Sequence, residues 1–301
     1  MQTVIMGAEA LASGSIDVVV AGGMESMTNA PYLLKKHRSG ARIGHDTAYD
    51  HMFLDGLEDA YEPGRAMGTF AQDTANEYQL TREEMDAYSI ESLARANRAI
   101  ESGAFADEVV PVTVATRAGE VVVEHDEAPS KGRPDKIPQL RPAFAKDGTI
   151  TAATSSSISD GAAAVVLTRA SVAEAKGLAP VARIVAAAAH AHAPALFTTA
   201  PIPAIQKVLD KAGWSVDDVD LFEVNEAFAC VAMFAMRDLG IPHDKINVNG
   251  GGTALGHPIG ASGTRIIVTL LNALKQQGKK RGVASLCIGG GEATAVAVEL
   301  I

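Results

Sequence analysis

Apolar residues follow two different spacings along this chain, and together they predict a layered α/β protein. Helical spacing of apolar positions predicts a helix over residues 1–11 that ends near Gly14. The β-branched run of residues 16–20 then leads into Gly22-Gly23. A continuous run of this kind is typical of a central strand that is buried on both faces.

Strand and helix patterns alternate regularly in the second half. After Asp160-Gly161, strands are predicted over residues 163–167, 183–187, 220–224, 247–249, 283–288 and 294–300. Helices are predicted over residues 205–212, 227–239 and 264–277. Alternation of this kind indicates an α/β layered fold.

Residues from about 27 to 142 have a different character, with many charged residues, Pro and Gly and several short segments. One helix stands out among them. Thr81 and Glu84 form a capping-box pattern at its start, and Gly103 lies beyond its end.

Composition narrows the functional classes. The chain has 301 residues, enough for one large domain or two ordinary ones, with 47% hydrophobic and 21% charged residues. Its formal net charge of −10 argues against sequence-independent binding to nucleic acid, which needs clustered Lys and Arg. No stretch is long and apolar enough to cross a bilayer, so no membrane partner is predicted.

Only two cysteines are present, Cys230 and Cys287. They suggest neither a disulfide framework nor a zinc site, and a reducing, cytoplasmic setting fits them. No signal peptide is visible at the start. The eight histidines do not cluster with Cys, Asp or Glu at ligand spacing, so no metal site is predicted.

Three C-terminal segments carry candidate chemistry. They are NEAF at residues 225–228, the glycine-rich run at residues 249–263, and CIGGG at residues 287–291. Singly, each has an ordinary structural explanation: a helix cap, a loop and a buried thiol. All three lie at strand ends or beside them, where open α/β sheets bind ligands.

These segments resemble the signature sequences of thiolases. NEAF, GGTALGHPIGASG and CIGGG occur in the family's order, and VVVAGGMESM at residues 18–27 resembles its N-terminal half. The resemblance implies an α/β thiolase fold with αβαβα layers, two related mixed-sheet halves and an inserted loop domain. It assigns residues 1–26 and 158–170 to the N-terminal half, 27–157 to the loop domain and 171–301 to the C-terminal half.

Catalytic roles follow from the resemblance residue by residue. His257 resembles the histidine that activates the nucleophile, and Cys287 resembles the cysteine that exchanges the α-proton of acetyl-CoA. Asn225 resembles the residue that fixes a water in one oxyanion hole. The backbone N–H of Gly289 resembles a donor of the other hole.

Binding residues are implied in the same way. Ala152 and Ser156 match positions that contact the pantetheine of coenzyme A, and Phe228 and Met67 match residues flanking the acyl and pantetheine channel. Phe197 stands in a loop over the acyl pocket where many short-chain members have Met. Coenzyme A and acetyl-CoA are implied as substrates, with no permanently bound cofactor, and a homodimer or homotetramer as the intact form.

The opening of the chain departs from the family pattern. In thiolases the nucleophile lies in a Cys-x-Ser-Gly segment directly before a helix, and residues 1–7 look like that helix with the segment removed. Neither Cys230 nor Cys287 can take the place of this nucleophile in the sequence. The expectation is therefore an incomplete N-terminal half with exposed strand edges, poor solubility or assembly, and a chain that cannot form the acyl-enzyme.

Several functions agree with these patterns. The first is an acetyl-CoA C-acetyltransferase that condenses two acetyl-CoA or runs the reverse thiolysis. A degradative 3-ketoacyl-CoA thiolase with longer substrates is a close alternative. Cys287 argues against a carrier-protein-dependent condensing enzyme. A binder without turnover, which holds coenzyme A or pairs with an intact subunit, is the alternative from another class.

Overall fold

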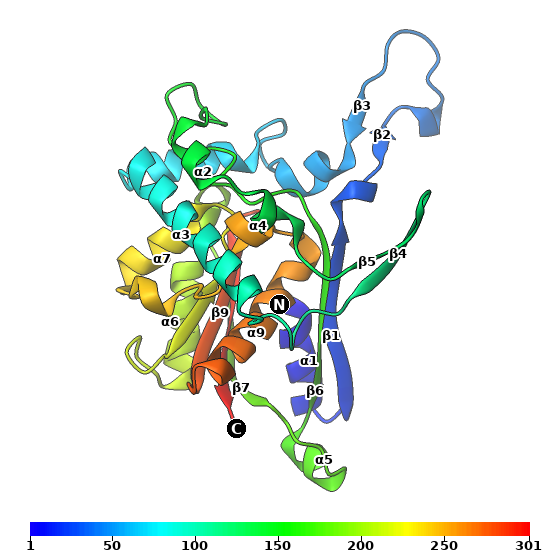
Figure 1. Cartoon of the computed structure of the whole chain (residues 1–301). Coiled ribbons are helices and arrows are strands. Elements are labelled where there is room, and N and C mark those ends of the chain that lie inside the picture. Colours follow the sequence, from blue (N-terminus) through cyan, green and yellow to red (C-terminus); the bar gives the residue numbers. More distant parts are fainter.

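The computed structural model describes all 301 residues, and its centre is a four-stranded mixed sheet (Figure 1). The strand order is β7 (Ala182–Ala191), β10 (Glu292–Leu300), β9 (Arg281–Ile288) and β8 (Leu221–Val224). β8 runs parallel to β9, and the other pairs are antiparallel.

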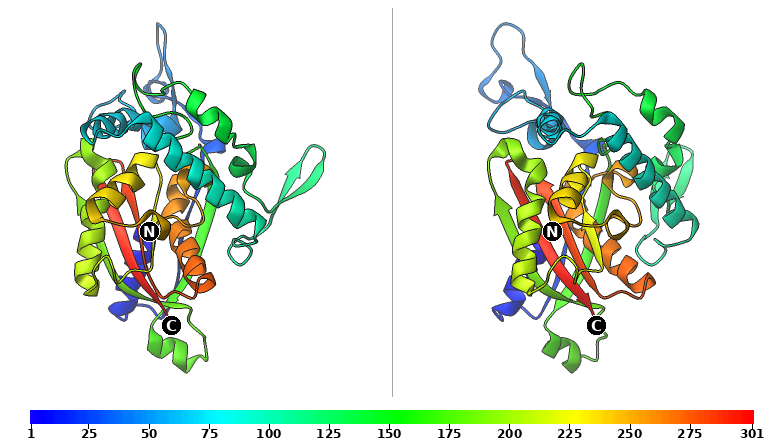
Figure 2. Two further views of the ribbon diagram at one scale, coloured as in Figure 1. Left: turned by 60° about the vertical axis from the view of Figure 1, so that its left-hand side comes forward. Right: turned by 90° about the vertical axis from the view of Figure 1, so that its left-hand side faces the viewer.

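Helices cover both faces of this sheet. Side chains of β10 alternate between two cores, with Ala295 and Ala297 in one and Val296 and Val298 in the other. The first core contains α6 (Pro201–Ala212) and α7 (Ala229–Leu239), and the second contains α9 (Ile259–Gln276) and α1 (Gln2–Ala12). Figure 2 shows α6 and α9 on opposite sides of the red strands.

A second sheet lies beyond α9. It pairs β1 (Val18–Ser26) with β6 (Asp160–Thr168) in antiparallel register from Val18↔Thr168 to Ser26↔Asp160. α1 and α9 both contact these two strands. α9 therefore forms a layer shared by the two sheets.

The strand that includes residues 16–20 is not buried on both faces, as the apolar run predicted. β1 begins at Val18, and Val20 and Met24 are 69% and 75% exposed. The reason is that β1 pairs only with β6, and helices cover one face of the pair. The opposite face, with Val166 of β6, is open to solvent.

The strand predicted over residues 247–249 is also wrong. Asn247 has a positive φ of 48° and begins a turn. Its side chain accepts from the N–H of Val224 at 2.8 Å and donates to the carbonyl of Val224 at 2.8 Å. Asn tolerates this conformation, and its amide caps the end of β8 instead of extending a sheet.

The segment between β1 and β6 folds over the carboxyl end of the central sheet (Figure 1). The predicted capping box is confirmed, since the Thr81 side chain and the Glu84 side chain each bond to the other residue's backbone at the start of α3 (Arg82–Glu101). Other elements of the chain are β2 (Tyr32–Leu34), β3 (Ala48–Asp50), α2 (Met67–Glu77), β4 (Val112–Thr116), β5 (Gly119–Val123), α4 (Glu127–Lys131), α5 (Ala170–Ala175) and α8 (Gly252–Leu255). No helix has the length and apolar character needed to span a membrane.

Candidate active site

A cavity of about 380 Å³ lies under the segment that joins β1 to β6. Six of the eight residues singled out from the sequence line it: Met67, Ser156, Phe228, His257, Cys287 and Gly289. Asn225 is 1% exposed and lies outside the lining, and Ala152 is exposed elsewhere. The cavity wall is mostly apolar, which suits a ligand with a hydrocarbon part.

Cys287 lies near the end of β9, opposite Ala293 of β10. Its thiol is buried, and burial raises its pKa to about 12 because a thiolate loses its hydration there. The group is therefore a neutral thiol at pH 7. Cys230 is fully buried inside α7 and does not reach the cavity, so Cys287 is the one cysteine that lines it.

His257 stands in the loop between α8 and α9. Its Nδ1 lies 2.6 Å from the hydroxyl of Ser262. Burial, together with the positive charge of Arg265, lowers its pKa to about 4. The imidazole is therefore neutral at pH 7, as a group that accepts a proton must be.

Gly256 explains how His257 reaches this position. It has a φ of +92°, and an added Cβ would lie 2.1 Å from the Ser159 hydroxyl oxygen. Only glycine permits both the left-handed backbone and the close approach. The backbone conformation and the close approach to Ser159 therefore explain why a glycine precedes His257 in the sequence.

Asn225 ends β8. Its backbone N–H donates to the carbonyl of Ser285 at 3.0 Å. Neither its amide nitrogen nor its amide oxygen bonds to another group of the chain, although both are buried. A buried amide without an internal partner is available to a ligand or to water.

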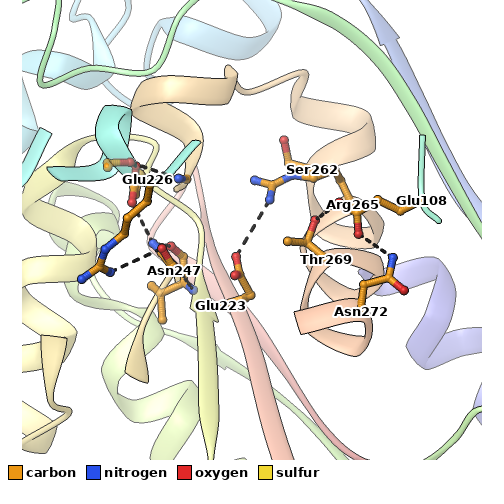
Figure 3. Close-up of polar contacts among 12 residues, drawn as sticks. Glu108, Glu223, Glu226, Asn247, Ser262, Arg265, Thr269 and Asn272 are labelled. Carbon is orange, nitrogen blue, oxygen red and sulfur yellow. Dashed lines mark hydrogen bonds and ion pairs between the residues drawn. The ribbon is translucent and has the colours of Figure 1, made fainter. Parts of the chain in front are cut away.

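Glu226, the next residue, is the centre of a buried network that the sequence reading missed (Figure 3). It accepts hydrogen bonds from the side chains of Tyr88, Ser92, Asn247 and Thr253 and from the backbone N–H of Thr253, at 2.7–3.1 Å. Tyr88 and Ser92 belong to α3. These hydrogen bonds therefore attach α3 to the residue directly after Asn225. An acidic residue in a strand-to-helix turn was the only sequence signal.

Aromatic rings close one side of the cavity. The ring centroid of Phe228 lies 6.4 Å from that of Phe197 and 5.9 Å from that of Phe144. Gly68 leaves room for Phe144, because an added Cβ would lie 2.2 Å from its ring. Sequence reading identified Phe197 and Phe228 but not Phe144.

A second hollow, of about 630 Å³, lies between α3 and α4. Seven of its eight lining residues are polar or charged, and none belongs to the three C-terminal segments. The apolar cavity around Cys287 is therefore the better candidate. No cluster of three His, Cys, Asp or Glu side chains could hold a metal ion.

A buried thiol and a neutral imidazole thus lie at one apolar cavity of an α/β protein, and comparisons with known proteins give the family. The thiolase N-terminal domain matches residues 1–171 and the thiolase C-terminal domain matches residues 178–300. The chain belongs to the thiolase family.

Individual relatives in sequence and in structure belong to the same family. The chain is 48% identical to an acetyl-CoA acetyltransferase of Escherichia coli (strain K12), over 99% of this chain and 76% of the relative. The crystal structure of the Bacillus anthracis acetyl-CoA acetyltransferase matches with a TM-score of 0.96 and 42% identity, over 100% of this chain and 76% of that one. A thiolase from Ascaris suum in complex with coenzyme A matches with a TM-score of 0.93 and 41% identity, at the same coverage.

The thiolase fold is confirmed. The comparisons do not bear out the expectation of an inactive chain that lacks an N-terminal segment; the alignment with the Escherichia coli relative covers 99% of this chain and 76% of that relative. The three-part domain boundaries and the roles of the site residues remain predictions.

Proposed function

We propose that this chain is an acetyl-CoA C-acetyltransferase of the thiolase type, with coenzyme A thioesters as its substrates. The observation that supports it is that His257, Cys287 and Gly289 line one apolar cavity, with Asn225 directly after the neighbouring strand β8. A sequence identity of 48% to a relative named acetyl-CoA acetyltransferase supports the same proposal. Cytoplasmic location and a homo-oligomeric state remain predictions.

Each group has a proposed part in the proton transfer. Cys287 exchanges the α-proton of the bound acetyl group, and the sulfur becomes a thiolate only when a base has taken its own proton. The unpartnered amide of Asn225 fixes a water in one oxyanion hole, and the N–H of Gly289 donates in the other, so that both holes stabilise the negative charge that forms on thioester oxygens. His257, neutral in the resting site, accepts a thiol proton and later returns it.

The experiment measures two reactions of the purified chain. The first is exchange of the acetyl methyl protons of acetyl-CoA with D₂O, and the second is thiolysis of acetoacetyl-CoA by coenzyme A. Both are expected to fall by about 10²-fold or more in Cys287→Ala. Cys230→Ala, which removes the thiol outside the cavity, is the control. Full activity of Cys287→Ala would contradict the assigned role, and absence of both reactions in the parent chain would contradict the activity.

One observation favours a second candidate, a coenzyme A-binding protein without turnover. A ping-pong route holds the acyl group on one thiol while a second handles the proton, and Cys287 is the one thiol at the cavity. Saturable binding of coenzyme A in calorimetry, together with no thiolysis above background, would support this candidate. Thiolysis that depends on Cys287 would exclude it.

A further inference from the structure

A polar stripe along α9 ends at the candidate active site. Ser262, Arg265, Thr269 and Asn272 recur at spacings of three and four and share one face of the helix (Figure 3). Thr269 and Asn272 both donate to Glu108, at 3.0 and 2.8 Å. Only Ser262 of this stripe bonds to His257.

Counting hydrogens around Ser262 distinguishes the two neutral forms of His257. The serine oxygen has two short contacts, at 2.6 Å to Nδ1 of His257 and at 3.0 Å to the carbonyl of Pro258. A hydroxyl has one hydrogen to donate, and the carbonyl can only accept. Both contacts are hydrogen bonds only if Nδ1 carries the proton and donates to Ser262, which then donates to Pro258.

The other neutral form of His257 leaves one of the two contacts of Ser262 without a hydrogen bond. With the proton on Nε2, Ser262 would donate to Nδ1, and its oxygen would face the Pro258 carbonyl without a hydrogen between them. Ser262 is fully buried, so no solvent compensates for that contact. His257 lines the cavity, and no group of the chain forms a hydrogen bond with its Nε2.

We propose that Ser262 is a positioning residue that holds His257 in its Nδ1–H form and leaves the lone pair of Nε2 directed to the cavity. This inference rests on the proposed function only for its consequence, which is that Nε2 is the atom that takes a thiol proton. The proton arrangement itself is a property of the folded chain.

The surroundings also keep the ring uncharged. His257 directly precedes the first turn of α9, where the partial positive charge of the helix disfavours an imidazolium. Arg265 adds a full positive charge nearby. A neutral ring with a fixed tautomer is ready to accept a proton without first rotating.

The test is nitrogen NMR of the chain labelled with ¹⁵N-histidine, with the His257 signals identified by their absence in His257→Gln. The expected result is a protonated Nδ1 and an unprotonated Nε2 at pH 7. Ser262→Ala is expected to shift the population toward the Nε2–H form, and Ser262→Thr, which keeps the hydroxyl, to restore it. Ser89→Ala is the control, because the Ser89 hydroxyl is also buried but has no hydrogen-bond partner.

A predominant Nε2–H form in the parent chain would overturn the proposal, and so would an unchanged tautomer in Ser262→Ala. If Ser262→Ala fails to fold, the signals of the parent chain still decide. In acetyl-CoA proton exchange, Ser262→Ala is expected to lower kcat by about tenfold or more with KM unchanged. A parent chain that shows the Nδ1–H form but no exchange would sink the proposed function and leave the role of Ser262 standing.

Discussion

At the scale of single residues, burial decides the charge of the ionisable groups near the cavity. Glu223 of β8 is 1% exposed, and burial raises its pKa to about 8 although Arg265 acts in the opposite direction. Its nearest cation is Nη1 of Arg265, at 3.9 Å from Oε2, too far for a direct hydrogen bond. Glu223 is therefore mainly a protonated acid at neutral pH.

This protonation predicts a pH dependence of stability. The unfolded chain releases the Glu223 proton near pH 4.5 and the folded chain near pH 8. The folded state therefore binds more protons between these values, and the stabilisation is present at pH 4.5 and lost as the pH rises to 8. Urea unfolding at pH 5 and pH 8 should show a smaller loss of unfolding free energy in Glu223→Gln than in the parent. Equal losses would contradict the assignment.

Phe197 supports a prediction on substrate length. Its ring is 3% exposed and packs at the cavity beside Phe228. Phe197→Ala should lengthen the apolar space and raise the rate with six-carbon 3-ketoacyl-CoA relative to acetoacetyl-CoA. The unfolding free energy should fall by about 3–5 kcal/mol. Phe105→Ala, a buried ring outside the cavity lining, controls for lost packing; an unchanged preference in Phe197→Ala would refute the role.

At the scale of elements, the sequence predicted most of the helices and strands of the second half, because their apolar periodicity is strong and their ends carry glycine. It could not predict the partners of Glu226, because Tyr88 lies 138 residues away in the chain. The face of β1 that is open to solvent could not be foreseen either, since a β-branched run does not reveal how many neighbours a strand has. Asn225 was recognised by its motif, but its lack of an internal partner needed coordinates.

The Glu226 network predicts that α3 depends on one carboxylate. Glu226→Gln replaces one acceptor oxygen by an NH₂ donor, which faces the donors of either Tyr88 and Asn247 or Ser92 and Thr253. We expect the unfolding free energy to fall by about 3 kcal/mol, as for other broken buried charge networks. Urea unfolding measures it, and Glu101→Gln, on the exposed side of α3, is the control. A loss no larger than that of the control would show that the network contributes little.

At the scale of the whole molecule, the β1–β6 sheet presents an apolar surface. Val20 and Val166 lie opposite each other in register, and each is 69% exposed. Exposed strands with apolar side chains pair readily with other chains. Association between copies of the chain is therefore expected at this face.

Val20→Lys should reduce that association, because a charge on the face opposes pairing. Size-exclusion chromatography with light scattering over a range of concentrations measures the mass. Val110→Lys provides the comparison, since Val110 is 79% exposed but lies outside this sheet. Equal masses for Val20→Lys and the parent would place the contact elsewhere.

The position of α9 between the two sheets limits how the polypeptide can be divided. The family domains meet between residues 171 and 178, yet the helix that covers β1 and β6 comes from the second domain. A fragment of residues 1–171 would lack the main cover of its own sheet, so neither piece should be stable when expressed alone. Production of the two fragments in the same cell is the arrangement that could give a folded product.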